Sequence, residues 1–139
     1  MKKALVIYNS KTGKTKSFAE NISNFLNENN IDAKAVSIIE SKNDDVLNAD
    51  YIFLGCWTSG LFLILQHPEK VWIEFANTLP DLKNKKVGLF TTYKLATGSM
   101  FRNMKKHLNG KIDDVLIEIK SRNNKLDTRN SEKILEFIK

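Results

Sequence analysis

The chain has 139 residues, of which 42% are hydrophobic and 27% are charged. These proportions are those of an ordinary soluble globular protein, and the size predicts a single domain over residues 1–139. The apolar runs are far shorter than the roughly 18 residues of a membrane-spanning helix, so we expect no membrane association. The single cysteine, Cys56, excludes an internal disulfide and is typical of the reducing cytoplasm, where we expect the protein to be located.

The net charge of +6 is unevenly distributed along the chain. Residues 1–80 carry 8 basic and 9 acidic side chains, whereas residues 81–139 carry 14 basic and 7 acidic ones. This asymmetry indicates an anionic ligand or partner near the C-terminal half, although a solvated lysine-rich surface would give the same pattern. We expect no nucleic acid as a partner, because the chain lacks zinc-ligand spacing, a recognition-helix signature and an aromatic RNA-binding motif.

Apolar, β-branched runs alternate with segments of helical periodicity along the chain. The predicted strands, in chain order, are 4–8, 33–38, 51–55, 87–91 and 115–119. The predicted helices are about 15–29, 41–48, 68–79, 100–108 and 131–138. Ser41 and Ser131 are the expected N-caps of the second and fifth of these helices.

This alternation predicts an α/β fold, a three-layer α/β/α sandwich around a five-stranded parallel sheet. The runs 4–8, 51–55 and 87–91 are almost wholly apolar, as central strands buried on both faces should be. The run 33–38 alternates polar and apolar residues, which favours an edge position.

The segment Asn9–Thr15, NSKTGKT, connects the first strand to the first helix. Ligands of open parallel sheets bind at the carboxyl ends of the strands, and a helix N-terminus with free N–H groups there attracts anions. Gly13 permits a positive φ, and Ser10, Thr12 and Thr15 add three hydroxyl donors. The segment therefore predicts a phosphate-binding loop.

The Gly-Lys-Thr triplet at residues 13–15 also resembles the end of a Walker A loop, but the rest of that motif is missing. The first glycine of the motif would fall on Tyr8, and neither 51–55 nor 87–91 ends in the acidic residue that helps to hold magnesium. We therefore expect neither a nucleoside triphosphatase nor a metal site.

The pattern Ser10-x-Thr12-Gly13-x-Thr15 after a first strand resembles the phosphate loop of the flavodoxin family, and the similarity extends over essentially the whole chain. The resemblance implies the strand order 2-1-3-4-5 and FMN as the cofactor. It assigns the phosphate-binding loop to Ser10, Lys11, Thr12, Gly13, Lys14 and Thr15. The short connection 120–130 before the last helix is similar to that of the short-chain members.

The resemblance also implies that two further loops, 55–68 and 91–99, hold the flavin ring. Trp57 is expected to stack on the ring or, alternatively, to anchor the loop in the core, and Tyr93 is expected to cover the ring as the second aromatic. The other expected contacts are Cys56, Thr58, Ser59, Gly60, Thr92 and Gly98. The apolar run 61–65 would shield the flavin, dock a partner or pack against the following helix.

The sequence departs from the family in its charge, because the loop 91–99 carries Lys94 and no carboxylate where family members are usually acidic. This departure implies redox partners with acidic docking faces, or an anionic small-molecule substrate.

Three functions follow from the resemblance. The first is an FMN-binding electron-transfer protein that passes single electrons between a reductase and an acceptor enzyme. The second is an FMN-dependent reductase that acts directly on an anionic aromatic or tetrapyrrole substrate. A related reading is a flavoprotein similar to the activators of ribonucleotide reductase, and the third is a non-flavin module that uses the fold as an interaction scaffold. The sequence indicates no catalytic side chain, since Cys56 and the two histidines lack partners at catalytic or metal-ligand spacing.

Overall fold

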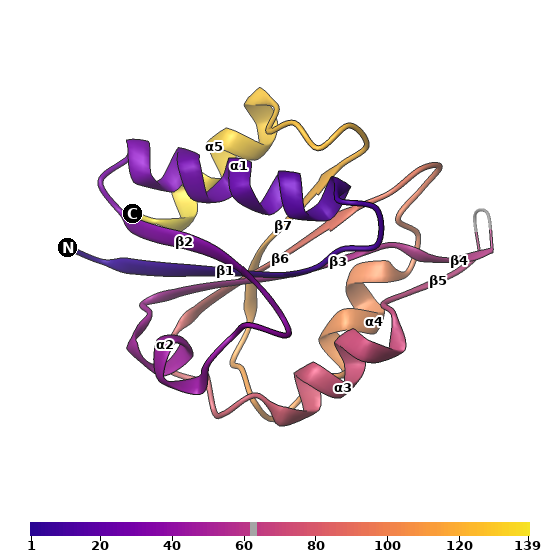
Figure 1. Ribbon diagram of the computed structural model, residues 1–139, viewed down its shortest axis with the longest axis horizontal. Coiled ribbons are helices and arrows are strands. Elements are labelled where there is room, and N and C mark those ends of the chain that lie inside the picture. Colours follow the sequence, from indigo (N-terminus) through magenta and orange to yellow (C-terminus); the bar gives the residue numbers. More distant parts are fainter. Residues whose placement is uncertain (62–63) are drawn as a thin grey trace.

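The computed structural model describes the backbone of residues 1–61 and 64–139 and the side chains of residues 1–59 and 66–139 (Figure 1). Parallel strands form a five-stranded sheet with the order β2-β1-β3-β6-β7. These strands are β1 (Lys3–Asn9), β2 (Asp32–Ser37), β3 (Tyr51–Trp57), β6 (Lys86–Thr92) and β7 (Val115–Ser121). When only these five strands are numbered in chain order, the order across the sheet is 2-1-3-4-5, which confirms the predicted fold class.

Helices cover both faces of this sheet (Figure 1). One face packs against α1 (Lys14–Glu28) and α5 (Thr128–Phe137), and the other against α2 (Asn43–Asn48), α3 (Lys70–Thr78) and α4 (Met100–Lys106). In β1, Leu5 and Ile7 belong to the core beneath α2, α3 and α4, whereas Val6 belongs to the core beneath α1 and α5. Because successive strand residues point to opposite faces, a strand buried on both sides must be apolar throughout.

A two-stranded antiparallel hairpin follows β3, where the sequence predicted only a loop over 55–68. Its strands are β4 (Ser59–Leu61) and β5 (Ile64–His67). In Figure 1 the hairpin extends beyond the carboxyl ends of the central strands. The roles considered for the apolar run 61–65 concern side chains that lie outside the described residues.

Strand β3 is longer than predicted and ends at Trp57 rather than at Gly55. Trp57 pairs with Thr92 of β6 in the last rung of the ladder between the two strands. The prediction that Trp57 lies in the loop 55–68, beyond the end of the strand, is therefore wrong. Glycine is a weak local stop signal, and pairing with a long neighbouring strand overrides it.

Both predicted helix caps are wrong. Helix α5 begins at Thr128, and the Asp127 side chain accepts a hydrogen bond from the Asn130 backbone N–H at 2.8 Å, so Ser131 lies inside the helix. Helix α2 begins at Asn43 with Lys42 at its N-cap, one residue after Ser41. Aspartate and serine are comparable N-caps, and local sequence alone did not distinguish them.

Lysines of the basic C-terminal half cap the carboxyl ends of helices. Lys111 Nζ donates three hydrogen bonds at the end of α3, to the carbonyl oxygens of Ala76 (2.9 Å), Asn77 (2.6 Å) and Leu79 (2.8 Å). Lys85 Nζ donates to two carbonyl oxygens at the end of α2, those of Leu47 and Ala49, both at 2.6 Å. A cation at this end of a helix satisfies carbonyls that have no partner in the helix and complements its dipole.

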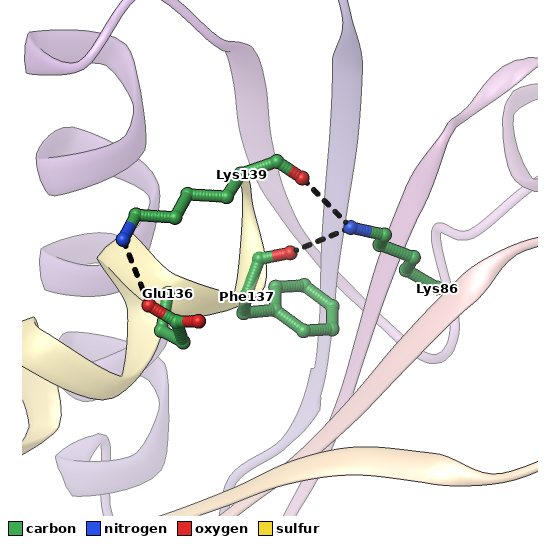
Figure 2. Close-up of polar contacts among 4 residues, drawn as sticks. All are labelled: Lys86, Glu136, Phe137 and Lys139. Atoms are coloured by element: carbon green, nitrogen blue, oxygen red, sulfur yellow. Dashed lines mark hydrogen bonds and ion pairs between the residues drawn. The ribbon is translucent and has the colours of Figure 1, made fainter.

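Lys86 does the same for α5 (Figure 2). Its Nζ donates to the backbone oxygens of Phe137 at 3.1 Å and Lys139 at 3.0 Å, while Lys139 Nζ pairs with Glu136 at 3.0 Å. Part of the positive charge of residues 81–139 therefore has a structural role. Lys85 and Lys86 precede or begin β6 and so lie at the amino-terminal edge of the sheet, far from the ends where ligands bind.

Candidate functional site

A cavity of about 670 Å³ lies at the carboxyl ends of β1, β3 and β6. Its walls come from the loop before α1, the end of β3 with the hairpin, and the loop after β6. The lining residues are Lys11, Thr12, Lys14, Thr15, Trp57, Thr58, Ser59, Gln66, Thr92, Tyr93, Lys94, Leu95 and Ala96. The volume is in the usual range for a site that holds one small molecule or cofactor.

The loop before α1 has the geometry of an anion site. Gly13 occupies the N-cap position with a φ of 92°, which confirms the predicted need for glycine. The Gly13 backbone N–H donates to Ser10 Oγ at 3.0 Å and tightens the turn. No side chain among the described residues caps the helix, so its first-turn N–H groups remain available as donors. Thr12 is exposed at the cavity and brings a hydroxyl to the same place.

Thr15 links the first loop to the end of β6. Its hydroxyl is buried and lies 2.6 Å from the hydroxyl of Thr92, and both residues line the cavity. A hydroxyl both donates and accepts. When Thr92 donates to Thr15, the Thr15 proton is free to point to an anion, so the pair can support a phosphate and hold two walls together.

Trp57 forms a wall of the cavity and is half-buried, with its other contacts in the core beneath α2, α3 and α4. The two roles considered for it, ring stacking and core anchoring, are therefore compatible. Lys11 Nζ lies 4.8 Å from the centre of its ring. Trp57 Nε1 is buried without a hydrogen-bond partner among the described residues.

Tyr93 also lines the cavity and lies directly after β6. Its backbone N–H donates to the Ser121 carbonyl at 3.2 Å, which fixes it beside β7. Two cations lie near its ring, with Lys120 Nζ at 5.7 Å and Arg122 Cζ at 5.4 Å from the ring centre. These distances are in the range of cation–π attraction.

Nine of the predicted cofactor contacts line this cavity: Lys11, Thr12, Lys14, Thr15, Trp57, Thr58, Ser59, Thr92 and Tyr93. Thr58 is tied to β6, since its N–H donates to the Thr92 carbonyl at 2.9 Å and its hydroxyl lies 2.8 Å from that of Thr91. Ser10 and Gly13 instead line a smaller hollow of about 270 Å³ on the other side of the same loop.

Of the remaining predicted contacts, Cys56 and Gly98 do not line the cavity, and the contacts of Gly60 lie outside the described residues. Cys56 is fully buried, and burial raises the pKa of its thiol to about 11, so it is a packing residue rather than a nucleophile. Gly60 lies in β4. Gly98 has a φ of 48° and packs so closely on Gln66 that an added Cβ would lie 2.2 Å from Gln66 Oε1.

Sequence reasoning missed Gln66 and Leu95 as lining residues. Gln66 is buried, and its carbonyl accepts hydrogen bonds from Asn103 Nδ2 at 2.7 Å and Ser99 Oγ at 3.0 Å, which joins β5 to α4. The available signal for Gln66 was its place as a polar residue directly after the apolar run 61–65. Leu95 lines the cavity and is 56% exposed, so it adds apolar surface at the rim.

The cavity wall is cationic. Its lining includes Lys11, Lys14 and Lys94 and no Asp or Glu among the described residues. Within the same residues, no group of three or more His, Cys, Asp or Glu could hold a metal ion. Hydroxyls, helix N–H groups and lysines suit an anionic ligand, and the two aromatics suit a flat ring attached to it. The donor set thus fits a phosphorylated aromatic cofactor.

None of the described helices combines the length and the apolarity that crossing a bilayer requires.

Comparisons with known proteins agree with this geometry. The family model described as "Flavodoxin domain" matches residues 5–129. A flavodoxin of Clostridium beijerinckii is 30% identical over 105 residues, covering 76% of this chain and 75% of that protein.

Two solved structures share the fold. The solution structure of two-electron reduced Megasphaera elsdenii flavodoxin has a TM-score of 0.77 at 24% identity and covers 96% of each chain. The crystal structure of Fusobacterium nucleatum flavodoxin bound to flavin mononucleotide has a TM-score of 0.65 at 18% identity, covering 99% of this chain and 95% of that one. Given the family match over most of its length, the chain belongs to the flavodoxin family, whose cofactor is FMN and whose members transfer electrons.

Proposed function

We propose that the cavity binds FMN and that the protein passes single electrons between a reductase and an acceptor enzyme. One observation carries this proposal. The N-terminus of α1, which no side chain among the described residues caps, and the aromatic side chains of Trp57 and Tyr93 all border one cavity of about 670 Å³. We further propose that the chain works as a single domain, in the cytoplasm that its lone cysteine favours.

The phosphate is assigned to the loop before α1. The hydroxyls of Thr12 and Thr15, which line the cavity, and the first N–H groups of α1 are hydrogen-bond donors to a dianion and need no metal ion, while Ser10 holds the turn by accepting from the Gly13 N–H. Lys11 and Lys14 add electrostatic attraction from the cavity wall.

The flavin ring is assigned to the space between the other two walls. Trp57 and Tyr93 provide aromatic surface, while Thr58 and Ser59 provide polar contacts. FMN supplies the redox chemistry when it is bound, and the protein orients the ring and excludes water from it.

Thr12→Ala is expected to weaken FMN binding about tenfold and to leave riboflavin binding unchanged. The reason is that a hydrogen bond to a charged group contributes about 1.5–3 kcal/mol, part of which water recovers at this exposed position. Titrating the apoprotein with each flavin and following flavin fluorescence measures both dissociation constants.

Thr128→Ala is the matched control for this experiment, because Thr128 is also exposed but lies at the start of α5. It should change neither affinity. Equal weakening of FMN and riboflavin in Thr12→Ala would mean that the loop does not hold the phosphate.

Lys94→Glu is expected to lower the midpoint potential of the low-potential flavin couple by roughly 40–90 mV. Lys94 lines the cavity, and reversing its charge removes attraction for the extra electron and adds repulsion. Two unit changes of charge near a protein surface amount to about 1–2 kcal/mol at separations on the order of 10 Å once solvent screening is included. Potentiometric titration at low and high salt measures the shift, and Lys83→Glu, an exposed change at the other end of β6, is the control. Equal shifts in both variants would remove Lys94 from the flavin environment.

An FMN-dependent reductase acting on an anionic aromatic or tetrapyrrole substrate is the second candidate, and an activator-like flavoprotein for ribonucleotide reductase is a third. The cationic cavity wall favours the reductase reading. Saturable turnover of such a substrate by the reduced protein alone would favour the reductase function over the electron-carrier function. For the carrier, the same charge favours redox partners with acidic docking faces.

A further inference from the structure

We propose that Lys94, Leu95, Lys120 and Arg122 form the docking surface for an acidic redox protein, and that Tyr93 beneath them is where the electron enters or leaves. This inference rests on the proposed electron-carrier function and specifies where its partner binds. We call these four residues the β7-side surface.

The four residues lie together beside the cavity although they come from two separate segments. Lys120 and Arg122 both approach the Tyr93 ring, at 5.7 and 5.4 Å from its centre. Arg122 Nη2 also donates to the Leu95 carbonyl at 3.4 Å, which joins the end of β7 to the loop after β6. A partner on this surface would therefore contact a ring that also lines the cavity.

The charge of the β7-side surface is not neutralised within the protein. Lys94, Lys120 and Arg122 are exposed, and none of them has an ion pair with a carboxylate among the described residues. Other basic residues of the C-terminal half are occupied, such as Lys105 in an ion pair with Glu118 and Lys111 in the cap of α3. The cations beside Tyr93 are thus available for a partner, and they lie next to a ring that lines the cavity.

The segment that carries Arg122 is held in place. Ser121 Oγ donates to the Lys125 carbonyl at 3.0 Å, and Asn21 of α1 donates to the Asn124 carbonyl at 2.8 Å. Asn124 has a φ of 60°, a conformation that asparagine tolerates better than most residues. A preformed loop loses little conformational entropy when a partner binds.

The composition of the surface favours a protein over a small anion. Arginine and tyrosine are enriched at protein interfaces, and an exposed leucine beside them supplies apolar area that a free phosphate or carboxylate would not cover. Complementary charge chiefly accelerates association and orients the partner, as transient electron transfer requires. The occupant is therefore a protein with a carboxylate-rich face around its own redox centre.

The test compares electron transfer from the FMN-loaded, reduced protein to two haem proteins, an acidic cytochrome b5 and a basic cytochrome c. At low ionic strength we expect Lys120→Glu/Arg122→Glu to slow reduction of the acidic acceptor at least about tenfold, because steering by charge changes association rates by about 10 to 1,000-fold. Reduction of the acidic acceptor by the unmodified protein should slow at high salt, and the basic acceptor should show no such slowing.

Lys2→Glu/Lys83→Glu is the matched control, since it changes the net charge equally at exposed positions before β1 and β6. It should slow the acidic acceptor by less than about twofold. A neutral quinone, whose association charge does not steer, measures any change in driving force, and the rate with the acidic acceptor is divided by the rate with the quinone for each of the three proteins.

The β7-side surface would be overturned as the docking site if both double variants reduced the acidic acceptor equally slowly, or if Lys120→Glu/Arg122→Glu reduced it at the unmodified rate. A faster reaction with the basic acceptor at low salt would overturn it as well. Failure of the proposed function is distinguishable, because the purified protein would then lack visible flavin absorbance and would reduce none of the three acceptors.

Discussion

Trp57→Ala is expected to weaken FMN binding about 100-fold. Trp57 is the last residue of β3, lines the cavity and is half-buried, so that part of its ring is available to the flavin. Stacking on an aromatic side chain contributes about 1–3 kcal/mol per base-like ring, and a 100-fold loss corresponds to about 2.7 kcal/mol. Titration of the apoprotein, with flavin fluorescence as the signal, measures the loss.

Trp57→Phe is the control, since it keeps an aromatic face and should lose no more than about tenfold in affinity. Because Trp57 also packs against the core, thermal unfolding of both variants must be measured beside the binding. If Trp57→Ala loses stability but binds FMN within about threefold of the unmodified protein, the residue is a core anchor and does not contact the flavin.

Gly55→Ala is expected to destabilise the protein by about 3 kcal/mol or more. Gly55 faces Phe90 directly across the β3–β6 pair, and an added Cβ would lie 2.1 Å from Phe90 Cε2. Phe90 is fully buried and packs edge-on against Phe18 at 6.0 Å, so its ring has little room to move. Overpacking of a rigid core costs about 1–3 kcal/mol and occasionally more. Denaturant unfolding measures the change.

Gly110→Ala separates the steric effect from the general effect of replacing glycine. Gly110 has a φ of 85° but nothing within 4 Å of an added Cβ, so only backbone strain of about 1 kcal/mol is expected. Gly55→Ala combined with Phe90→Leu should recover part of the lost stability. A loss below about 1 kcal/mol in Gly55→Ala would show that the strands can move apart.

The sequence was sufficient for the sheet, because buried parallel strands require continuous apolar runs and edge strands do not. The runs containing Leu5, Phe53 and Leu89 became the three central strands, and the alternating run at 33–38 became the edge strand β2. Family membership confirms FMN as the predicted cofactor and electron transfer as the class of function. The end of β3 and the hairpin were missed because they depend on pairing between strands rather than on local pattern.

The candidate site was predictable only in part, for a similar reason. The loop at Ser10–Thr15 carries its own signal in hydroxyls, glycine and position, so its residues could be proposed directly. The hydrogen bond between Thr15 and Thr92 joins residues 77 positions apart, and no local pattern indicates it. Leu95 and Gln66 likewise reach the cavity through tertiary packing.

The burial of Cys56 has a practical consequence for experiments on this protein. With a pKa of about 11 and no exposed surface, its thiol stays protonated at neutral pH and reacts slowly with alkylating reagents or peroxide while the protein is folded. A second cysteine introduced on the surface would then be the reactive thiol. Spectroscopic labels or crosslinkers can therefore be attached at a chosen position without first removing the native cysteine.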